Sequence, residues 1–153
     1  AWEAGVGEDH PDFCAASSCL AVARLRAARL ATEEALRADH GAVPSAVADL
    51  QLALQRSALD GVPPAEAALG AELLIRADWE QKVTEGLAAA LASTDAFAVQ
   101  AALDAAQGAE MAGGWAEHAA RWLQQRNEQE EAAEEARLAA LRHAQEVAER
   151  ERE

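Results

Sequence analysis

Apolar residues recur at intervals of three and four along most of this chain, which is the spacing of amphipathic helices. Together with the capping residues between them, these stretches predict five helices, over residues 18–39, 46–60, 64–92, 95–112 and 115–152. The fold class expected from the pattern is therefore all-α. It is a bundle of four to five Ala-rich helices with a long charged helix at its C-terminal end.

The breaks between the predicted helices carry the chemistry of helix ends. Gly41 and Gly61 stand where a left-handed residue closes a helix, and a Val-Pro sequence soon follows each of them. Ser45 is expected to cap the helix after the first break. The run 93–95 (Ser-Thr-Asp) is expected to end the third helix and cap the fourth, and the pair Gly-Gly at 113–114 marks the last break.

Each predicted helix has one face that is expected to point inward. In the first helix this face holds Leu20, Ala23, Ala27, Leu30 and Ala31. The corresponding residues of the later helices are Val47, Leu50, Leu54 and Ala58; Leu69, Leu73, Val83, Leu87 and Leu91; Phe97, Val99, Ala102, Leu103 and Ala106; and Trp115, Ala119, Trp122 and Leu123.

Three segments are expected along the chain. Residues 1–17 read as an irregular lead, residues 18–123 as the helical bundle, and residues 124–153 as an extended charged helix. The first two turns of this last segment have no apolar residue larger than Ala. A weak apolar stripe then returns at Leu138, Leu141 and Val147, which are predicted contacts for a partner protein.

Composition strengthens the all-α assignment. The 153 residues include 43 Ala and 17 Leu but one Ile, three Thr and no Tyr, so the residues that favour strands are scarce. The net charge of −14 argues against nucleic acid as a partner and disfavours an anionic membrane surface, while it allows a basic protein. The sequence predicts no transmembrane segment, and a place at the periphery of a membrane complex stays open.

The two cysteines, Cys14 and Cys19, are a candidate disulfide. If the first stands in the lead and the second in the first helical turn, a short loop can close and staple the lead to the helix. On one regular helix the two side chains would point about 140° apart, with no path to a disulfide. The alternatives are two reduced thiols that pack as small apolar groups, or thiols that bind zinc together with His10, although their spacing is not that of a zinc site.

No catalytic, cofactor-binding or metal-binding motif stands out in the sequence. The four histidines are scattered, and the acidic pairs such as Glu130 and Glu134 have the spacing of a solvated helix face. The chain is therefore expected to be non-enzymatic and to need no cofactor or metal. Among the four tryptophans, Trp2 stands in the lead, where a core position is hard to build, and it is predicted to enter a pocket of a partner.

The turns at Gly41 to Pro44 (Gly-Ala-Val-Pro) and Gly61 to Pro63 (Gly-Val-Pro), between Leu/Ala helices, resemble Ala-rich helical-hairpin segments of algal and protist proteins. The resemblance covers about residues 20–123. It implies a scaffold or linker role in a multiprotein assembly such as an axonemal, photosynthetic or mitochondrial complex. Because the shared motifs are turn chemistry, the resemblance carries over no binding or catalytic residue.

These observations favour a non-enzymatic scaffold or linker subunit that binds other protein subunits of a larger organellar (photosynthetic) or ciliary assembly. The alternative is a stand-alone acidic helical module that recognises a basic protein or peptide. An enzyme is the third class, without a motif in its favour. The first residue, Ala1, fits the cut that removes a targeting peptide, and it fits equally well a fragment of a longer protein.

Overall fold

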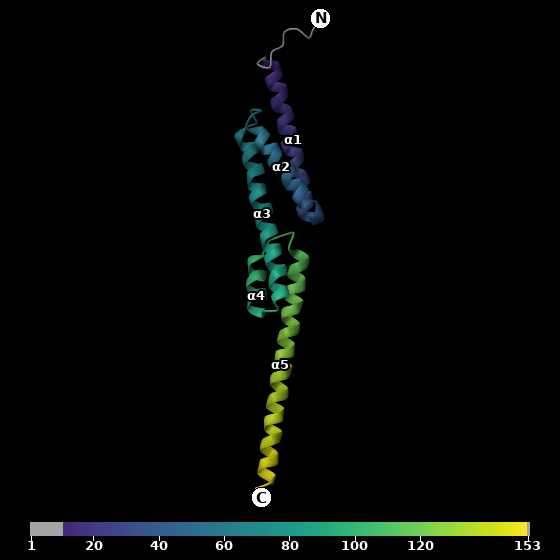
Figure 1. Ribbon diagram of the computed structural model, residues 1–153, viewed down its shortest axis with the longest axis vertical. Coiled ribbons are helices and arrows are strands. Elements are labelled where there is room, and N and C mark those ends of the chain that lie inside the picture. The colour runs from purple at the N-terminus through teal and green to yellow at the C-terminus, as the bar shows by residue number, and fades with distance from the viewer. Residues whose placement is uncertain (1–10, 153) are drawn as a thin grey trace. The chain divides into compact units, whose positions relative to one another are not determined.

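The structure, a computed structural model, describes residues 11–152, with side chains from residue 15 onward. Its helices are α1 (Pro11–Ala38), α2 (Val43–Ser57), α3 (Pro64–Ser93), α4 (Ala96–Ala105) and α5 (Gly113–Arg150), with a single 3₁₀ turn, η1 (His40–Ala42), before α2 (Figure 1). No strand is present within residues 11–152, so the all-α prediction is confirmed.

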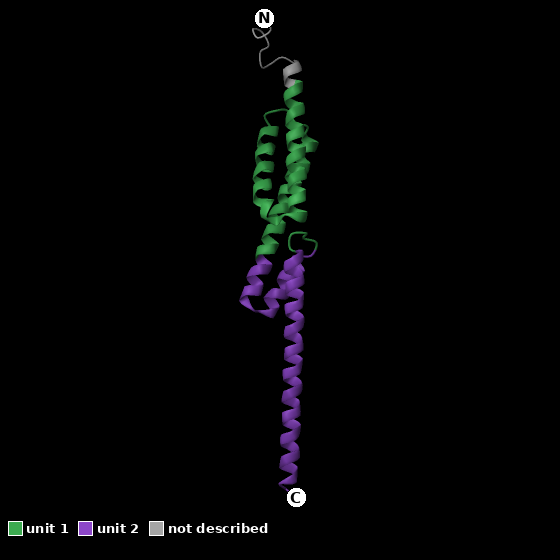
Figure 2. Cartoon of the chain, turned by 90° about the vertical axis from the view of Figure 1, so that its right-hand side faces the viewer, with its two compact units in different colours: residues 1–85, 108–112 green, residues 86–107, 113–153 purple. Residues whose placement is uncertain are grey.

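The chain forms two compact units, coloured separately in Figure 2. Unit 1 comprises residues up to Glu85 together with the short segment Gly108–Ala112, and unit 2 comprises Gly86–Gln107 and Gly113 onward. The division falls inside α3. These units do not coincide with the segments 18–123 and 124–153 expected from the sequence.

The core of unit 1 joins α1, α2 and the first part of α3. Its fully buried leucines are Leu25 and Leu36 from α1 and Leu50 from α2. Gly70 lets α3 approach closely, because a Cβ added there would lie 3.0 Å from Leu54 Cδ2 and 3.3 Å from Leu25 Cδ1. The missing side chain of Gly70 thus makes room for two leucines of the neighbouring helices.

The inward face of α1 predicted from the sequence is wrong. All five residues of that face, among them Leu20 and Leu30, are exposed. The buried face holds instead Ala21, Leu25, Thr32, Ala35 and Leu36.

Thr32 explains why the sequence pattern hid the buried face of α1. Its hydroxyl is fully buried and lies 2.9 Å from the carbonyl oxygen of Ala28 and 3.2 Å from that of Ala46 on α2. A buried hydroxyl is tolerated where it finds such partners. A polar residue in the middle of the face therefore serves as a tie between α1 and α2.

The first helix begins earlier than expected. α1 starts at Pro11, so the last seven residues of the predicted lead 1–17 are helical. Proline suits the first helical position because its fixed φ is helical and its missing N–H has no partner there anyway. Ser18 lies inside the helix, and its hydroxyl donates to the α2–α3 turn, 2.7 Å from the Asp60 carbonyl oxygen and 3.0 Å from that of Gly61.

The two Val-Pro turns differ in structure. Gly61 is left-handed with φ +68°, and the N–H of Val62 donates to the Ser57 carbonyl oxygen at 3.2 Å, so the predicted left-handed turn is confirmed, although α2 ends at Ser57 and not at residue 60. Gly41 lacks a positive φ and lies in η1. The predicted cap at Ser45 is also wrong, because α2 already begins at Val43, whose side chain is buried in the core of unit 1.

The last two predicted boundaries also need correction. α4 ends at Ala105 rather than at residue 112, and the chain then turns through Gly108, which has φ +84°. A break before the last helix is confirmed, but the pair 113–114 forms the first turn of α5, so the break lies at residues 106–112. The turn at 106–112 is instead held by buried alanines and by a contact with α3 that is described below.

In unit 2, α4 packs against the first half of α5. The buried residues are Leu87 and Ala90 at the end of α3, Val99 of α4, Ala106 directly after α4, and Ala119 of α5. From residue 127 to 152 every residue is exposed, and Figure 2 shows this part of α5 running on without a neighbour inside its unit.

Candidate functional site

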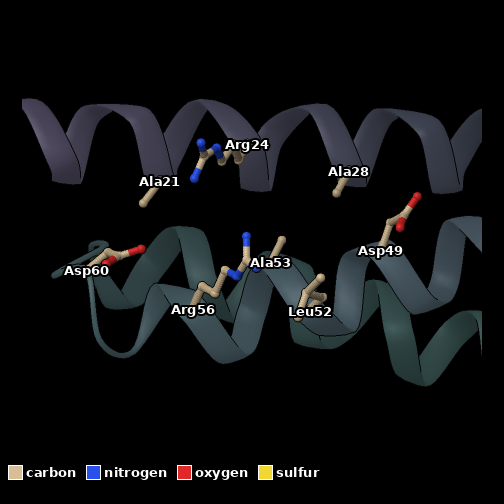
Figure 3. Close-up of a pocket in the computed structure, with 8 residues that line it drawn as sticks. All are labelled: Ala21, Arg24, Ala28, Asp49, Leu52, Ala53, Arg56 and Asp60. Carbon is tan, nitrogen blue, oxygen red and sulfur yellow. The ribbon is translucent and has the colours of Figure 1, made fainter.

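A groove between α1 and α2 is the first candidate site (Figure 3). Its cavity holds about 190 Å³, and its walls carry short or apolar side chains: Ala21, Ala28, Leu52 and Ala53. Arg24 lies along α1, Arg56 extends into the gap from α2, and Asp49 and Asp60 stand at the two ends of the groove. None of these four charged groups forms an ion pair with another described residue.

A second cluster joins α1 to the start of α3. The carboxylate of Glu66 pairs with Arg26 and, at 3.2 Å, with Arg29. The hydrogen bond from Arg26 lowers the pKa of Glu66, and the carboxylate in turn raises the pKa of Arg26. The pair therefore adds stability while the carboxylate is ionised, and this contribution is lost as pH falls through its lowered pKa. The effect is small, because solvent screens exposed pairs.

Glu80 of α3 is the one acid whose side chain is fully buried in the described part of unit 1. One carboxylate oxygen, Oε1, accepts from Arg76 Nε at 2.9 Å, and the other accepts from the backbone N–H of Met111 at 2.9 Å. Arg76 also pairs with Glu110 at 3.2 Å, and its hydrogen bond to Glu80 is the main reason why the pKa of Arg76 is raised. This cluster fastens the segment Gly108–Ala112 to α3 and is structural, because both carboxylate oxygens are already used.

In unit 2, Arg126 of α5 holds the end of α3. Its guanidinium donates to the Thr94 carbonyl oxygen at 2.9 Å, pairs with Glu130 at 3.1 Å and lies 5.4 Å from the ring centre of Trp122. Thr94 has φ +58°, a left-handed conformation that is strained for a β-branched residue. The next residue, Asp95, accepts from the Phe97 N–H at 3.0 Å, which confirms the predicted cap of the fourth helix.

The strain at Thr94 gives a testable prediction. We expect Thr94→Gly to raise the free energy of unfolding by about 0.5–1 kcal/mol, because glycine adopts a positive φ without steric cost. The carbonyl oxygen that Arg126 uses is unaffected by the change. Urea denaturation measures the effect, and Ser93→Gly, one residue earlier in regular helix, is the control and should destabilise instead.

Every residue in the second half of α5, residues 127–150, is exposed, and three of them are large and apolar. Leu138 is 48 % exposed, Leu141 53 % and Val147 39 %. Leu138 and Leu141 are three residues apart and share one side of the helix. Val147 follows Leu138 by nine residues, which at about 100° per residue places it on the opposite side. We call residues 127–150 the α5 arm.

The other sequence candidates are placed as follows. Trp2 lies outside the described residues, and so does the side chain of Cys14, although its backbone belongs to α1. Cys19 is exposed on the same helix. Because both cysteines fall within α1, the staple would require the first turn of that helix to open, and the disulfide stays a prediction.

Sequence reasoning missed both Glu80 and the groove between α1 and α2. The spacing of Arg76 and Glu80, four residues apart on a helix, was a visible signal for an ion pair, but nothing local marks that pair as buried. Arg24 and Arg56 line the same groove only because α1 and α2 pack together, so no local sequence pattern could have predicted this pair. Among the described residues, no group of three or more histidines, cysteines or acids is placed to hold a metal ion.

No helix in the described part of the chain combines the length and the apolar character needed to span a membrane. Comparisons with protein-family models, with curated protein sequences and with solved structures find no match for this chain.

Proposed function

We propose that this protein is a non-enzymatic scaffold or linker subunit of a larger protein assembly, and that the α5 arm is the part that contacts its neighbours. The observation that carries the proposal is the exposure of every residue from 127 to 152 on a helix that still bears large apolar side chains. A helix without tertiary contacts is marginal in water, since most helical stability in proteins comes from packing. A partner surface would supply that packing.

The two-sided placement of the apolar residues favours a linker. Leu138 and Leu141 lie on one side of the arm and Val147 on the other, so one flat partner surface cannot cover all three. Two neighbours, one on each side, can cover them. The resemblance of the Gly-Val-Pro turns to Ala-rich hairpin segments favours an organellar, photosynthetic or ciliary, complex within this proposal.

The test is recovery of a stoichiometric complex from the native source with the intact chain as bait. We expect Leu138→Glu combined with Leu141→Glu to abolish recovery of at least one partner, because a buried unpaired carboxylate is costly at an interface. Leu59→Glu is the matched control: Leu59 is 87 % exposed but lies outside the arm, and its variant should keep the complex.

The same complex can be examined by hydrogen exchange. In the isolated chain the amides of residues 127–150 should exchange almost freely, and in the complex they should be protected. Equal exchange in the two samples, or full recovery of the partner by the doubly substituted arm, would rule out the arm as the contact. Binding of a basic peptide alone, lost in moderate salt, would instead support the alternative, an acidic module that binds basic proteins. The five glutamates between residues 127 and 136 favour this alternative.

A further inference from the structure

The groove between α1 and α2 has an unusual distribution of charge for this acidic protein. Arg24 and Arg56 come from different helices and both line the cavity, with Arg24 lying along α1 and Arg56 extending into the gap from α2 (Figure 3). Like five other arginines of the chain, Arg24 and Arg56 have no carboxylate within 4.0 Å among the described residues, but these two line the same groove. Two like charges on one groove repel each other, and an anion bound between them offsets that repulsion.

The cavity lined by these two arginines is suited to a small ligand. Ala21, Ala28 and Ala53 leave open the space of about 190 Å³, which is less than the 300 Å³ or so at which drug-sized pockets begin. A guanidinium group offers a planar fork of N–H donors that matches a carboxylate or a phosphate.

We infer that the groove between α1 and α2 is a binding site for a compact anion, a carboxylate or phosphate group held between Arg24 and Arg56. Asp49 and Asp60 give the site its selectivity. They place negative charge at both ends of the groove, so an extended polyanion such as a nucleic acid or an acidic tail is repelled while a single anionic group is accepted. The site is independent of the α5 arm and of the scaffold role proposed above.

The experiment is a titration of the full chain with inorganic phosphate and, separately, with succinate at low ionic strength. Binding is followed by nuclear magnetic resonance of the backbone amides and of the arginine Nε–H groups. We expect saturable shifts at Arg24, Arg56 and the alanines of the groove. Arg24→Gln and Arg56→Gln should each weaken binding about tenfold, because each removes hydrogen bonds to a charged group.

Arg37→Gln is the matched control, since Arg37 is an exposed arginine of α1 that does not line the groove. This variant should bind phosphate as the unmodified chain does. A phosphoserine peptide distinguishes the source of the anion: tighter binding of the peptide than of phosphate indicates an anion carried by a polypeptide, and equal binding indicates a free ion.

Three results would overturn the inference. They are an absence of saturable shifts with both anions, equal weakening by Arg37→Gln, and tighter binding of an oligonucleotide than of phosphate. Because Arg24 and Arg56 are exposed and form no ion pair with a described residue, their glutamine variants should keep the helical circular dichroism of the unmodified chain. If a glutamine variant nevertheless lost its helical circular dichroism, phosphate binding would be measured with Arg24→Lys and Arg56→Lys instead. Weaker binding is expected for these two variants because lysine lacks the planar fork.

Discussion

Replacing Glu80 with alanine should lower the free energy of unfolding of unit 1 by about 1.5–3 kcal/mol, because a buried charged acceptor of two hydrogen bonds is removed. The change removes the acceptor of the Met111 N–H and leaves Arg76 without its buried partner. The segment Gly108–Ala112 then loses its attachment to α3. Urea denaturation followed by circular dichroism measures the change, and amide exchange at Met111 reports the loss of the attachment directly.

Two further variants of the same helix separate charge from hydrogen bonding. Glu80→Gln keeps an acceptor for one N–H but loses the charge that pairs with Arg76, so its effect should lie between that of alanine and none. Glu85→Ala is the control, because Glu85 is exposed and bonds only to the Gln81 side chain at 3.0 Å. A change below about 0.5 kcal/mol is expected there. Similar effects of Glu80→Ala and Glu85→Ala would refute a structural role for the buried carboxylate.

The second large effect concerns the inward face of α1. Leu25→Ala should destabilise unit 1 by about 2–5 kcal/mol, since a fully buried leucine is replaced and a cavity remains beside Leu54 and Gly70. Leu30→Ala, on the face that the sequence pattern favoured, should change stability by less than about 0.5 kcal/mol because Leu30 is 66 % exposed. Thermal or urea unfolding of the two variants gives the comparison, and the reverse order would mean that α1 packs by its other face.

The sequence by itself determined the helices and several of their ends. The abundance of Ala and Leu and the near absence of strand-forming residues left no alternative to an all-α chain. Gly61 and Asp95 were placed correctly because their roles depend on a backbone angle and on a hydrogen bond to a residue two positions away. Such effects act within one helical turn and are visible in a short stretch of sequence.

Tertiary structure decided which face of each helix is inside. In α1 the pairs Leu20 with Leu30 and Leu25 with Leu36 give two faces of similar apolar character, since alanine fills the positions between them. The free energies of burying the one face or the other differ by little. Which face is buried therefore depends on the neighbouring residues from distant parts of the chain. The pattern also could not foresee that Thr32 finds a carbonyl oxygen on α2.

The candidate sites divide in the same way. The exposure of the α5 arm was predicted from the sequence. The charged stretch that begins the arm has no large apolar side chain that could pack on the bundle. The buried carboxylate of Glu80 and the pair Arg24 and Arg56 could only come from the folded chain. Each depends on bringing together residues more than thirty positions apart, and no local hydrogen bond or helical period encodes that distance.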